Sequence, residues 1–314
     1  MSDFIFSLNA TIPVFLLMLS GWLLGRHGMF TEEFCKVSNK FVFHIALPVL
    51  LFRDIASTNI HQVFNIRFLL FCMIATTICF FTIWGLAKVF IKDKSITGAF
   101  VQASFRGSAA ILGIAFIQNI YGNSGMAPLM IIGAVPLFNI YSVIVLTFEG
   151  ESEDKNGIQK AVVNIVKNPI ILGIFIGLVF SMFHWYEKLP IILTKTVGNV
   201  AGMASPLALL VTGAGFEGRK ALTKIKPTMV ATLIKLVVMP AFFLPIAAWM
   251  GFRGQDMVAL LIMLGAPTTV TCYIMAVNMK NDGILSSSII VSATLLSSIT
   301  LTGWIYFLRV MNMI

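Results

Sequence analysis

Apolar residues fill most of this chain, in long runs separated by short groups of charged residues, Gly and Pro. A helix that crosses a membrane needs about 20 mostly apolar residues, and by that measure the chain holds about ten such runs. Their approximate bounds are 5–25, 36–56, 67–91, 97–121, 125–148, 165–186, 190–215, 226–251, 256–279 and 283–311. The pattern predicts an all-α polytopic membrane protein with about ten transmembrane helices.

A hydrophilic stretch from Glu149 to Lys167 separates the fifth run from the sixth. We place a first five-helix repeat at 1–148, a linker at 149–164 and a second repeat at 165–314. Because each half has an odd number of spans, homologous halves are inverted relative to each other, as in many secondary transporters. Three matches share an offset of 156–158 residues: ALPVLLF with ASPLALLV, Pro13 with Pro169, and YGNSG with KNDG. They favour a 5+5 inverted repeat.

Two runs in corresponding positions contain residues that weaken a helix. Gly113 interrupts the fourth run, and Gly265-Ala266-Pro267 interrupts the ninth. Paired broken helices are a strong sequence pointer to a transporter's binding site at the bilayer midplane. Freed N–H groups and the positive end of the following half-helix hold an anion there. The alternative is a simple kink, because Gly and Pro are common in membrane helices.

Composition and charge agree with a membrane protein. The chain is 58% hydrophobic and 11% charged, whereas soluble domains are roughly 25% charged. Its net charge of +9 lies mainly in short loops, so it is an orientation signal and not a nucleic-acid footprint. One set of alternate loops holds 13 Lys and Arg and the other holds 5. Since cytoplasmic loops carry the excess, we expect a cytoplasmic linker and both termini outside.

Four basic residues lie within the runs, namely Lys40, Arg106, Lys195 and Lys235, whereas all acidic residues fall in loops or near span ends. A basic interior favours an anionic substrate. Arg106 is followed by Gly107 in the broken fourth run, and its guanidinium offers a bidentate match to a carboxylate. We expect Lys40 and Lys195 to snorkel to the interface. Lys235 serves either packing or transport.

Other polar residues in the runs complete the candidate site. Ser108, Thr268 and Thr269 lie near the breaks and offer hydroxyl donors to an anion. Asn139 either lines the path or bonds between helices. His44 lies in mid-span, and since histidine is the residue type best suited to proton transfer, proton coupling is one hypothesis and packing is the other. The histidines and cysteines fall in no pattern typical of an enzyme, a metal site or a cofactor site.

Longer motifs resemble those of a known family. RGSAAILGIAFIQNIYG in the fourth run, VPLFNIYS in the fifth, NPIILGIFIG in the sixth and GAPTTVTCYIMA in the ninth are similar to the auxin efflux carrier family. The whole chain resembles its short bacterial members, the malate or malonate permeases. This resemblance implies a scaffold of helices one, two, six and seven and a transport domain of helices three to five and eight to ten. It also implies that helices four and nine cross at their breaks, beside an organic anion.

By the same motifs, the resemblance assigns Ser108, Gly113, Ala115, Asn139 and Pro267 with its neighbours to the anion site. Two positions depart from the family pattern. Ser108 stands where the family usually has Asn, and its shorter side chain weakens direct contact with the anion at that point. Ala115 stands where it usually has Pro, which leaves Gly113 alone to sustain the break.

These features predict a secondary transporter, not an enzyme, that moves a mono- or dicarboxylate across the cytoplasmic membrane by alternating access. Two alternatives stay open: a sodium-coupled anion symporter of the bile-acid type and a non-transporting carboxylate sensor. The expected partners are the organic anion and the lipid bilayer, with no nucleic acid, and a homodimer is left open. No cofactor or metal is expected. The substrate, the direction of transport and the coupling ion are not predicted.

Overall fold

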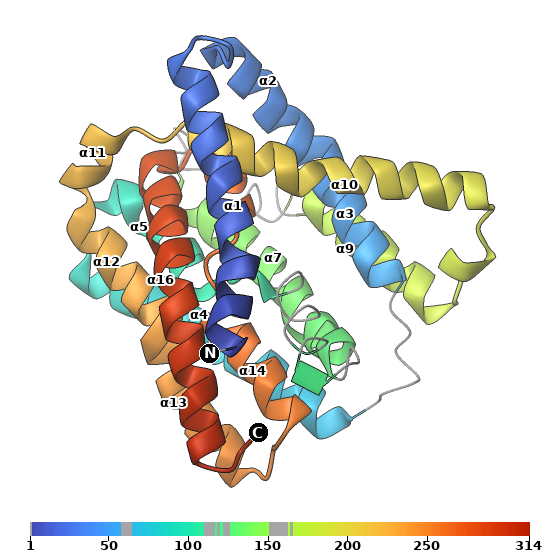
Figure 1. Ribbon diagram of the computed structural model, residues 1–314. Helices are drawn as coiled ribbons and strands as arrows, with labels where there is room; N and C mark the ends of the chain where they lie inside the picture. The colour runs from blue at the N-terminus through green and yellow to red at the C-terminus, as the bar shows by residue number, and fades with distance from the viewer. Residues whose placement is uncertain are drawn as a thin grey trace.

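The computed structural model describes the backbone of residues 2–57, 65–109, 117, 120, 121, 126–150, 163 and 166–314, and the side chains of the same residues apart from 2–11 and 219. Within this part of the chain the protein is helical, with one isolated β-bridge (Figure 1). The first half contains α1 (Ser2–Arg26), α2 (Glu32–Phe41), η1 (Val42–Ala46), α3 (Leu47–Ala56), α4 (Ile66–Phe90), η3 (Lys94–Ile96), α5 (Thr97–Phe105) and α7 (Ala127–Glu149). The second half contains α9 (Pro169–Met182), η4 (Tyr186–Lys188), α10 (Ile191–Ala214), α11 (Gly218–Thr223), α12 (Ile225–Leu233), η5 (Ile234–Val238), α13 (Met239–Trp249), α14 (Gln255–Gly265), α15 (Thr271–Asn278) and α16 (Gly283–Val310).

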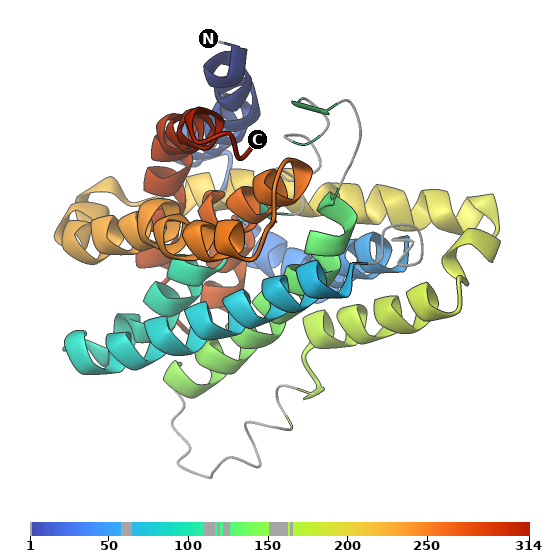
Figure 2. The same cartoon turned by 90° about the horizontal axis from the view of Figure 1, so that it is seen from below.

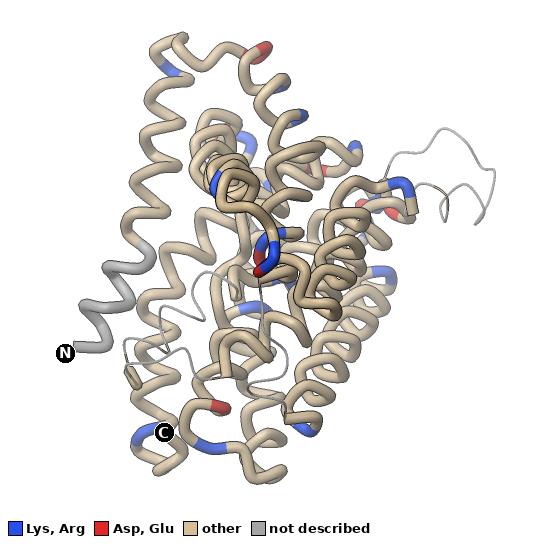
Figure 3. Tube along the Cα trace, turned by 90° about the vertical axis from the view of Figure 1, so that its right-hand side faces the viewer, with Lys and Arg blue, Asp and Glu red and all other residues tan. Residues whose placement is uncertain are grey.

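Each range expected to span the membrane overlaps at least one of these helices. Among the described residues, six helices are long and apolar enough to cross a membrane: Glu32–Ala56, Ile66–Phe90, Ala127–Glu149, Ile191–Ala214, Ile225–Trp249 and Gly283–Val310. Shorter apolar helices occupy Ile12–Arg26, Pro169–Met182 and Gln255–Gly265. Figure 3 shows long stretches of the helical trace without a charged residue. The prediction of an all-helical polytopic membrane protein is confirmed.

Two of the long helices contain a π-turn just before a proline. Pro48 follows η1, and Pro240 follows η5. A proline inside a helix lacks an N–H donor and its ring clashes with the carbonyl four residues earlier. A π-turn widens the helix at that point and relieves the clash, and such turns are frequent at functional sites. Because of η5, the helix from α12 to α13 continues past Pro240 while presenting Lys235 on its inner side.

For description, the helices can be divided into two groups that also pack on each other. In one group, α3 packs on α9 and α10, and α10 also packs on α1. In the other group, α4 packs on α5 and α7, while α16 packs on α12 and α15. In Figure 2 the helices α9 and α10, drawn in yellow, extend away from the rest of the bundle. The pairs α1 with α16 and α7 with α9 join the two groups.

Glycines allow α1 and α10 to cross in backbone contact (Figure 1). A Cβ added at Gly21 would lie 2.0 Å from the carbonyl oxygen of Leu210. A Cβ added at Gly213 would lie 1.9 Å from the carbonyl oxygen of Met18. Real side chains cannot approach a backbone so closely, so each crossing position requires Gly. The crossing brings the backbones of α1 and α10, one helix from each half, into direct contact.

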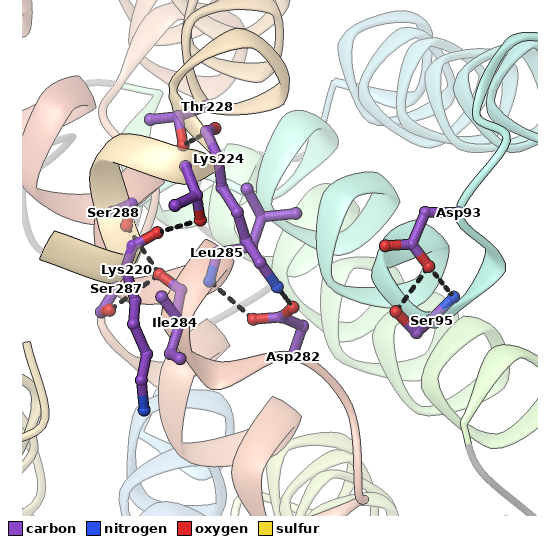
Figure 4. Close-up of polar contacts among 11 residues, drawn as sticks. Asp93, Ser95, Lys220, Lys224, Thr228, Asp282, Ile284, Leu285, Ser287 and Ser288 are labelled. Carbon is purple, nitrogen blue, oxygen red and sulfur yellow. Dashed lines mark hydrogen bonds and ion pairs between the residues drawn. The ribbon is translucent and has the colours of Figure 1, made fainter. Parts of the chain in front are cut away.

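Polar contacts fix the start of α16 (Figure 4). The carboxylate of Asp282 accepts a hydrogen bond from the N–H of Leu285 at 2.8 Å. It also forms an ion pair with the ammonium of Lys224. Burial lowers the pKa of Lys224, and Asp93 opposes that shift. The pKa of Asp93 is lowered because its carboxylate accepts hydrogen bonds from the hydroxyl and the N–H of Ser95. The contacts join the loop before α12 to the start of α16.

We predict that Gly213→Ala destabilises the fold, because the new methyl group overlaps a backbone carbonyl of α1. Overpacking of this kind costs about 1–3 kcal/mol. Gly202→Ala on the same helix is the matched control, since a Cβ there meets nothing within 4 Å. Thermal unfolding in detergent checks this prediction. Equal melting temperatures for the two variants would show that the glycine crossing is not required.

Candidate functional site

Two extended segments pair at the place where α5 and α14 end. The backbone leaves helical geometry at Arg106, with φ −90° and ψ 122°, and at Ala266, with φ −65° and ψ 148°. Gly107 and Thr268 then form an antiparallel bridge, and the N–H of Ser108 donates to the carbonyl of Pro267 at 2.8 Å. Each segment therefore supplies hydrogen-bond partners to the other, which a single unwound helix in an apolar environment lacks.

We call the two paired segments, with the ends of α5 and α14, the crossing. The hydroxyl of Thr268 also stabilises it. It donates to the carbonyl oxygen of Ala103 at 2.7 Å, in the last turn of α5. The last four carbonyls of a helix have no partner within the helix, so this side chain satisfies one of them. Thr268 is buried. Its proton is thus committed to the backbone, while its oxygen can still accept a hydrogen bond.

Lys235 donates hydrogen bonds to the C-terminal ends of both α5 and α14. Its side chain is 0% exposed, and its ammonium lies 2.8 Å from the carbonyl oxygen of Leu264, 3.2 Å from that of Met263 and 3.4 Å from that of Phe105. These carbonyls belong to the last turns of α14 and α5, whose C-terminal ends carry partial negative charge. One buried cation therefore neutralises two helix ends that meet.

Gly107 makes room for this lysine. A Cβ there would lie 2.8 Å from the Cε of Lys235, 2.9 Å from its Nζ and 3.0 Å from the carbonyl oxygen of Ala266. A larger residue would force the ammonium away from the carbonyls or separate the paired segments. The lysine and the β-bridge therefore depend on the same glycine.

Arg106, the residue after α5, is 5% exposed and points toward α7. Its guanidinium donates to the Oδ1 of Asn139 at 2.7 Å, the Sδ of Met275 at 2.7 Å and the Oγ of Ser142 at 3.4 Å. The amide of Asn139 is itself oriented by donating to the carbonyl of Val135 at 2.8 Å. All three partners of the guanidinium are neutral. Among the described residues no Asp or Glu forms an ion pair with it.

A small cavity of about 70 Å³ lies beside this arginine. Its walls combine the crossing and α7 with the helices α3 and α10. The lining polar residues are Asp54, Arg106, Ser108, Asn139, Ser205, Thr269 and Thr271. Ligand pockets usually measure about 300–1,000 Å³. At about 70 Å³ the cavity is smaller than most ligand pockets and has room for a carboxylate-sized group.

The structure thus brings together most residues that the sequence nominated. Arg106, Ser108, Asn139 and Thr269 line the cavity, whereas Thr268 and the carbonyl of Pro267 support the crossing. Gly113 and Ala115 lie outside the described residues. The helix α5 already ends at Phe105, so the chain leaves helical geometry earlier than the expected interruption at Gly113.

His44 lies apart from this cavity. Its side chain is exposed, its Nδ1 lies 2.9 Å from the carbonyl oxygen of Lys40, and it is not among the residues of the cavity wall. A role in proton coupling stays a prediction.

Comparison with known proteins shows the family to which the chain belongs. The chain matches the family model described as membrane transport protein over residues 6–305. It belongs to the membrane transport protein family. The match covers nearly the whole chain and confirms the resemblance to the auxin efflux carriers that the helix motifs indicated.

Two relatives align along nearly the full length of both chains, and a third aligns with only part of its own length. The "Uncharacterized transporter YfdV" of Escherichia coli is 23% identical over 98% of this chain and 99% of its own length. The "Putative malonate transporter" of Rhizobium meliloti is 23% identical over 95% of this chain and 94% of its own. The "Lysosomal cholesterol signaling protein" of Mus musculus is 24% identical over 74% of this chain but only 28% of its own length. The chain is therefore a membrane transporter by family.

Two features of this transporter were missed from the sequence. Lys235 was assigned to either packing or transport, and its contact with two helix ends was not foreseen. The signal was present, since a lysine halfway along an apolar run needs a nearby partner. Asp54 was placed at the end of a span, but it lines the cavity, with its carboxylate 2.7 Å from the guanidinium of Arg53. A carboxylate near the site was therefore overlooked.

We predict that Lys235→Met lowers the stability of the transporter, because three backbone carbonyls lose their donor. Hydrogen bonds to a charged group are worth about 1.5–3 kcal/mol. Lys195→Met is the matched control, because that lysine is exposed. Thermal unfolding of the purified proteins measures the difference. A Lys235→Met protein as stable as the control would mean that the ammonium does not hold the crossing together.

Proposed function

We propose that this protein is a secondary carrier that moves a small organic anion, a mono- or dicarboxylate, across the cytoplasmic membrane by alternating access. The observation that carries the proposal is the buried guanidinium of Arg106, held by neutral partners in the wall of a cavity. A charge inside a membrane is costly. A cation whose described partners are all neutral is well suited to receive an anion.

The cavity lies between the two packing groups, which supports an alternating-access mechanism. Leu51 on α3 and Ser205 on α10 form one wall, and Arg106, Asn139 and Thr269 form the other. In our proposal α1, α2, α3, α9 and α10 form the scaffold. The helices α4, α5, α7 and α12 to α16 form the transport domain. Movement of one group against the other would then open the cavity to each side of the membrane in turn.

We further propose that the two groups derive from a 5+5 inverted repeat over 1–148 and 165–314, joined by the cytoplasmic linker 149–164. In this view α5 and α14 are the first parts of broken helices four and nine. The support is the antiparallel pairing of Gly107 with Thr268 directly after each helix end. Helices α1 and α16 run side by side in opposite directions (Figure 1), which fits both termini on the outer side.

The carboxylate class rests on two supports. A guanidinium presents parallel N–H donors that match the two oxygens of a carboxylate. The relative from Rhizobium meliloti carries the name of a malonate transporter. A second function, a sensor that binds without moving its ligand, is favoured by the relative from Mus musculus, which is named a signaling protein.

Counterflow in proteoliposomes tests the carrier directly. Labelled acetate, lactate, malonate, malate and indole-3-acetate are exchanged with and without an imposed potential, sodium or a pH gradient. We expect exchange of at least one carboxylate, with Arg106→Gln lowering its binding about tenfold or more, since a charged hydrogen-bond donor is lost. Lys195→Gln serves as the control for removing one positive charge.

The outcomes separate the alternatives. Saturable carboxylate binding without exchange would make the protein a sensor, and exchange that requires sodium would make it a sodium symporter. An Arg106→Gln protein with wild-type exchange and affinity would remove the guanidinium from the site.

A further inference from the structure

A long apolar groove runs between α4 and the helix formed by α12, η5 and α13. Its volume is about 580 Å³, within the range of about 300–1,000 Å³ that ligand pockets occupy. The rims are exposed apolar side chains, among them Phe90 at 75%, Phe242 at 59% and Val230 at 50%. The groove is separate from the cavity beside Arg106, and no wall residue is shared between the two.

The two walls run antiparallel, so the groove has two different ends. Phe71 on α4 packs on Phe243 of α13, with ring centroids 6.5 Å apart, and this contact closes one end. The other end lies at Ile91 and Lys226, which line the groove together. Along α4 the lining extends from Ile78 to Phe90, a rise of about 18 Å at 1.5 Å per residue. The hydrocarbon core of one leaflet is about 15 Å thick, so the groove matches one acyl chain.

The open end is basic. Lys226 is exposed and lies in the groove wall, and Lys92 and Lys94 follow the end of α4. Among the described residues none of these three lysines forms an ion pair, in contrast to Lys88 and Lys224. The acidic neighbour in this loop, Asp93, accepts hydrogen bonds from Ser95 (Figure 4). Because cytoplasmic loops carry the excess of Lys and Arg, we expect this end on the cytoplasmic side.

We propose that the groove binds an anionic phospholipid of the cytoplasmic leaflet, with one acyl chain between α4 and α12 to α13 and its phosphate at Lys226. An apolar trough of one-leaflet length with cations at its open end is complementary to such a lipid in shape and in charge. A lysine near the membrane surface attracts anionic lipid by about 1 kcal/mol, roughly a fivefold preference. The proposal does not depend on which solute the transporter carries.

The lipid would lie against the element that holds the crossing. Ile234 and Val238, the first and last residues of η5, line the groove, and Lys235 between them points inward to the ends of α5 and α14. A lipid chain in the groove therefore supports the outer side of the π-turn whose inner side caps two helices. Loss of the lipid is expected to loosen η5.

Native mass spectrometry of the full-length protein in mixed micelles tests this site. The micelles contain equal amounts of phosphatidylglycerol, which is anionic, and phosphatidylcholine, which is zwitterionic. We expect the wild type to retain phosphatidylglycerol about fivefold over phosphatidylcholine. Lys226→Gln should remove most of that preference, and Lys36→Gln, at an exposed lysine on α2, should keep it.

A second pair of variants tests the groove itself. Val230→Trp places an indole in the groove and should reduce retention of both lipids several-fold. Val89→Trp, at a residue of α4 that is 76% exposed and outside the groove lining, should leave retention unchanged. Equal retention of the two lipids by the wild type, an unchanged preference in Lys226→Gln, or full retention in Val230→Trp would each overturn the proposal. A change of oligomeric state confined to Val230→Trp would instead assign the groove to a second copy of the chain.

Discussion

Two helices stop inside an apolar interior, and every backbone group that they release needs a partner there. No water is available in the hydrocarbon region, and each unsatisfied group costs several kcal/mol. The protein meets this constraint with three contacts: the bridge between Gly107 and Thr268, the hydroxyl of Thr268 on α5, and the ammonium of Lys235 on both helix ends. The cavity exists because the chain can unwind at this point and remain satisfied.

Arg106 and Lys235 are both buried in the described part of the chain, but they have different partners. Lys235 is saturated by carbonyl oxygens, and a compact ammonium suits that task. Arg106 bonds to an amide, a hydroxyl and a thioether, all neutral. The lysine stabilises the ends of α5 and α14 where they meet, and in our proposal the arginine offers its charge to a ligand. The π-turn η5 lies between the two sites: Lys235 is on its inner side, and its outer side lines the apolar groove.

The spans could be predicted from the sequence because hydropathy reports a local property, the length of an apolar run. The end of α14 at Gly265 could also be predicted from the sequence, because Gly265-Ala266-Pro267 weakens a helix locally. The end of α5 at Phe105 could not be predicted in this way, because it depends on the pairing of Gly107 with Thr268, a residue far along the sequence. The partners of Lys235 come from α5 and α14 for the same reason. Asn139 and Arg106 were nominated separately, and only the fold shows that they bond to each other.

Protection of a single cysteine from a membrane-permeant thiol reagent tests directly whether anions bind beside the paired ends of α5 and α14. The four native cysteines are replaced by alanine, and Ser108→Cys is introduced in the cavity wall. We expect malonate or another exchanged carboxylate to slow labelling of Ser108→Cys but not of Leu16→Cys, an exposed position on α1. Labelling at Ser108→Cys that stays constant at saturating concentrations of an exchanged carboxylate would contradict this expectation.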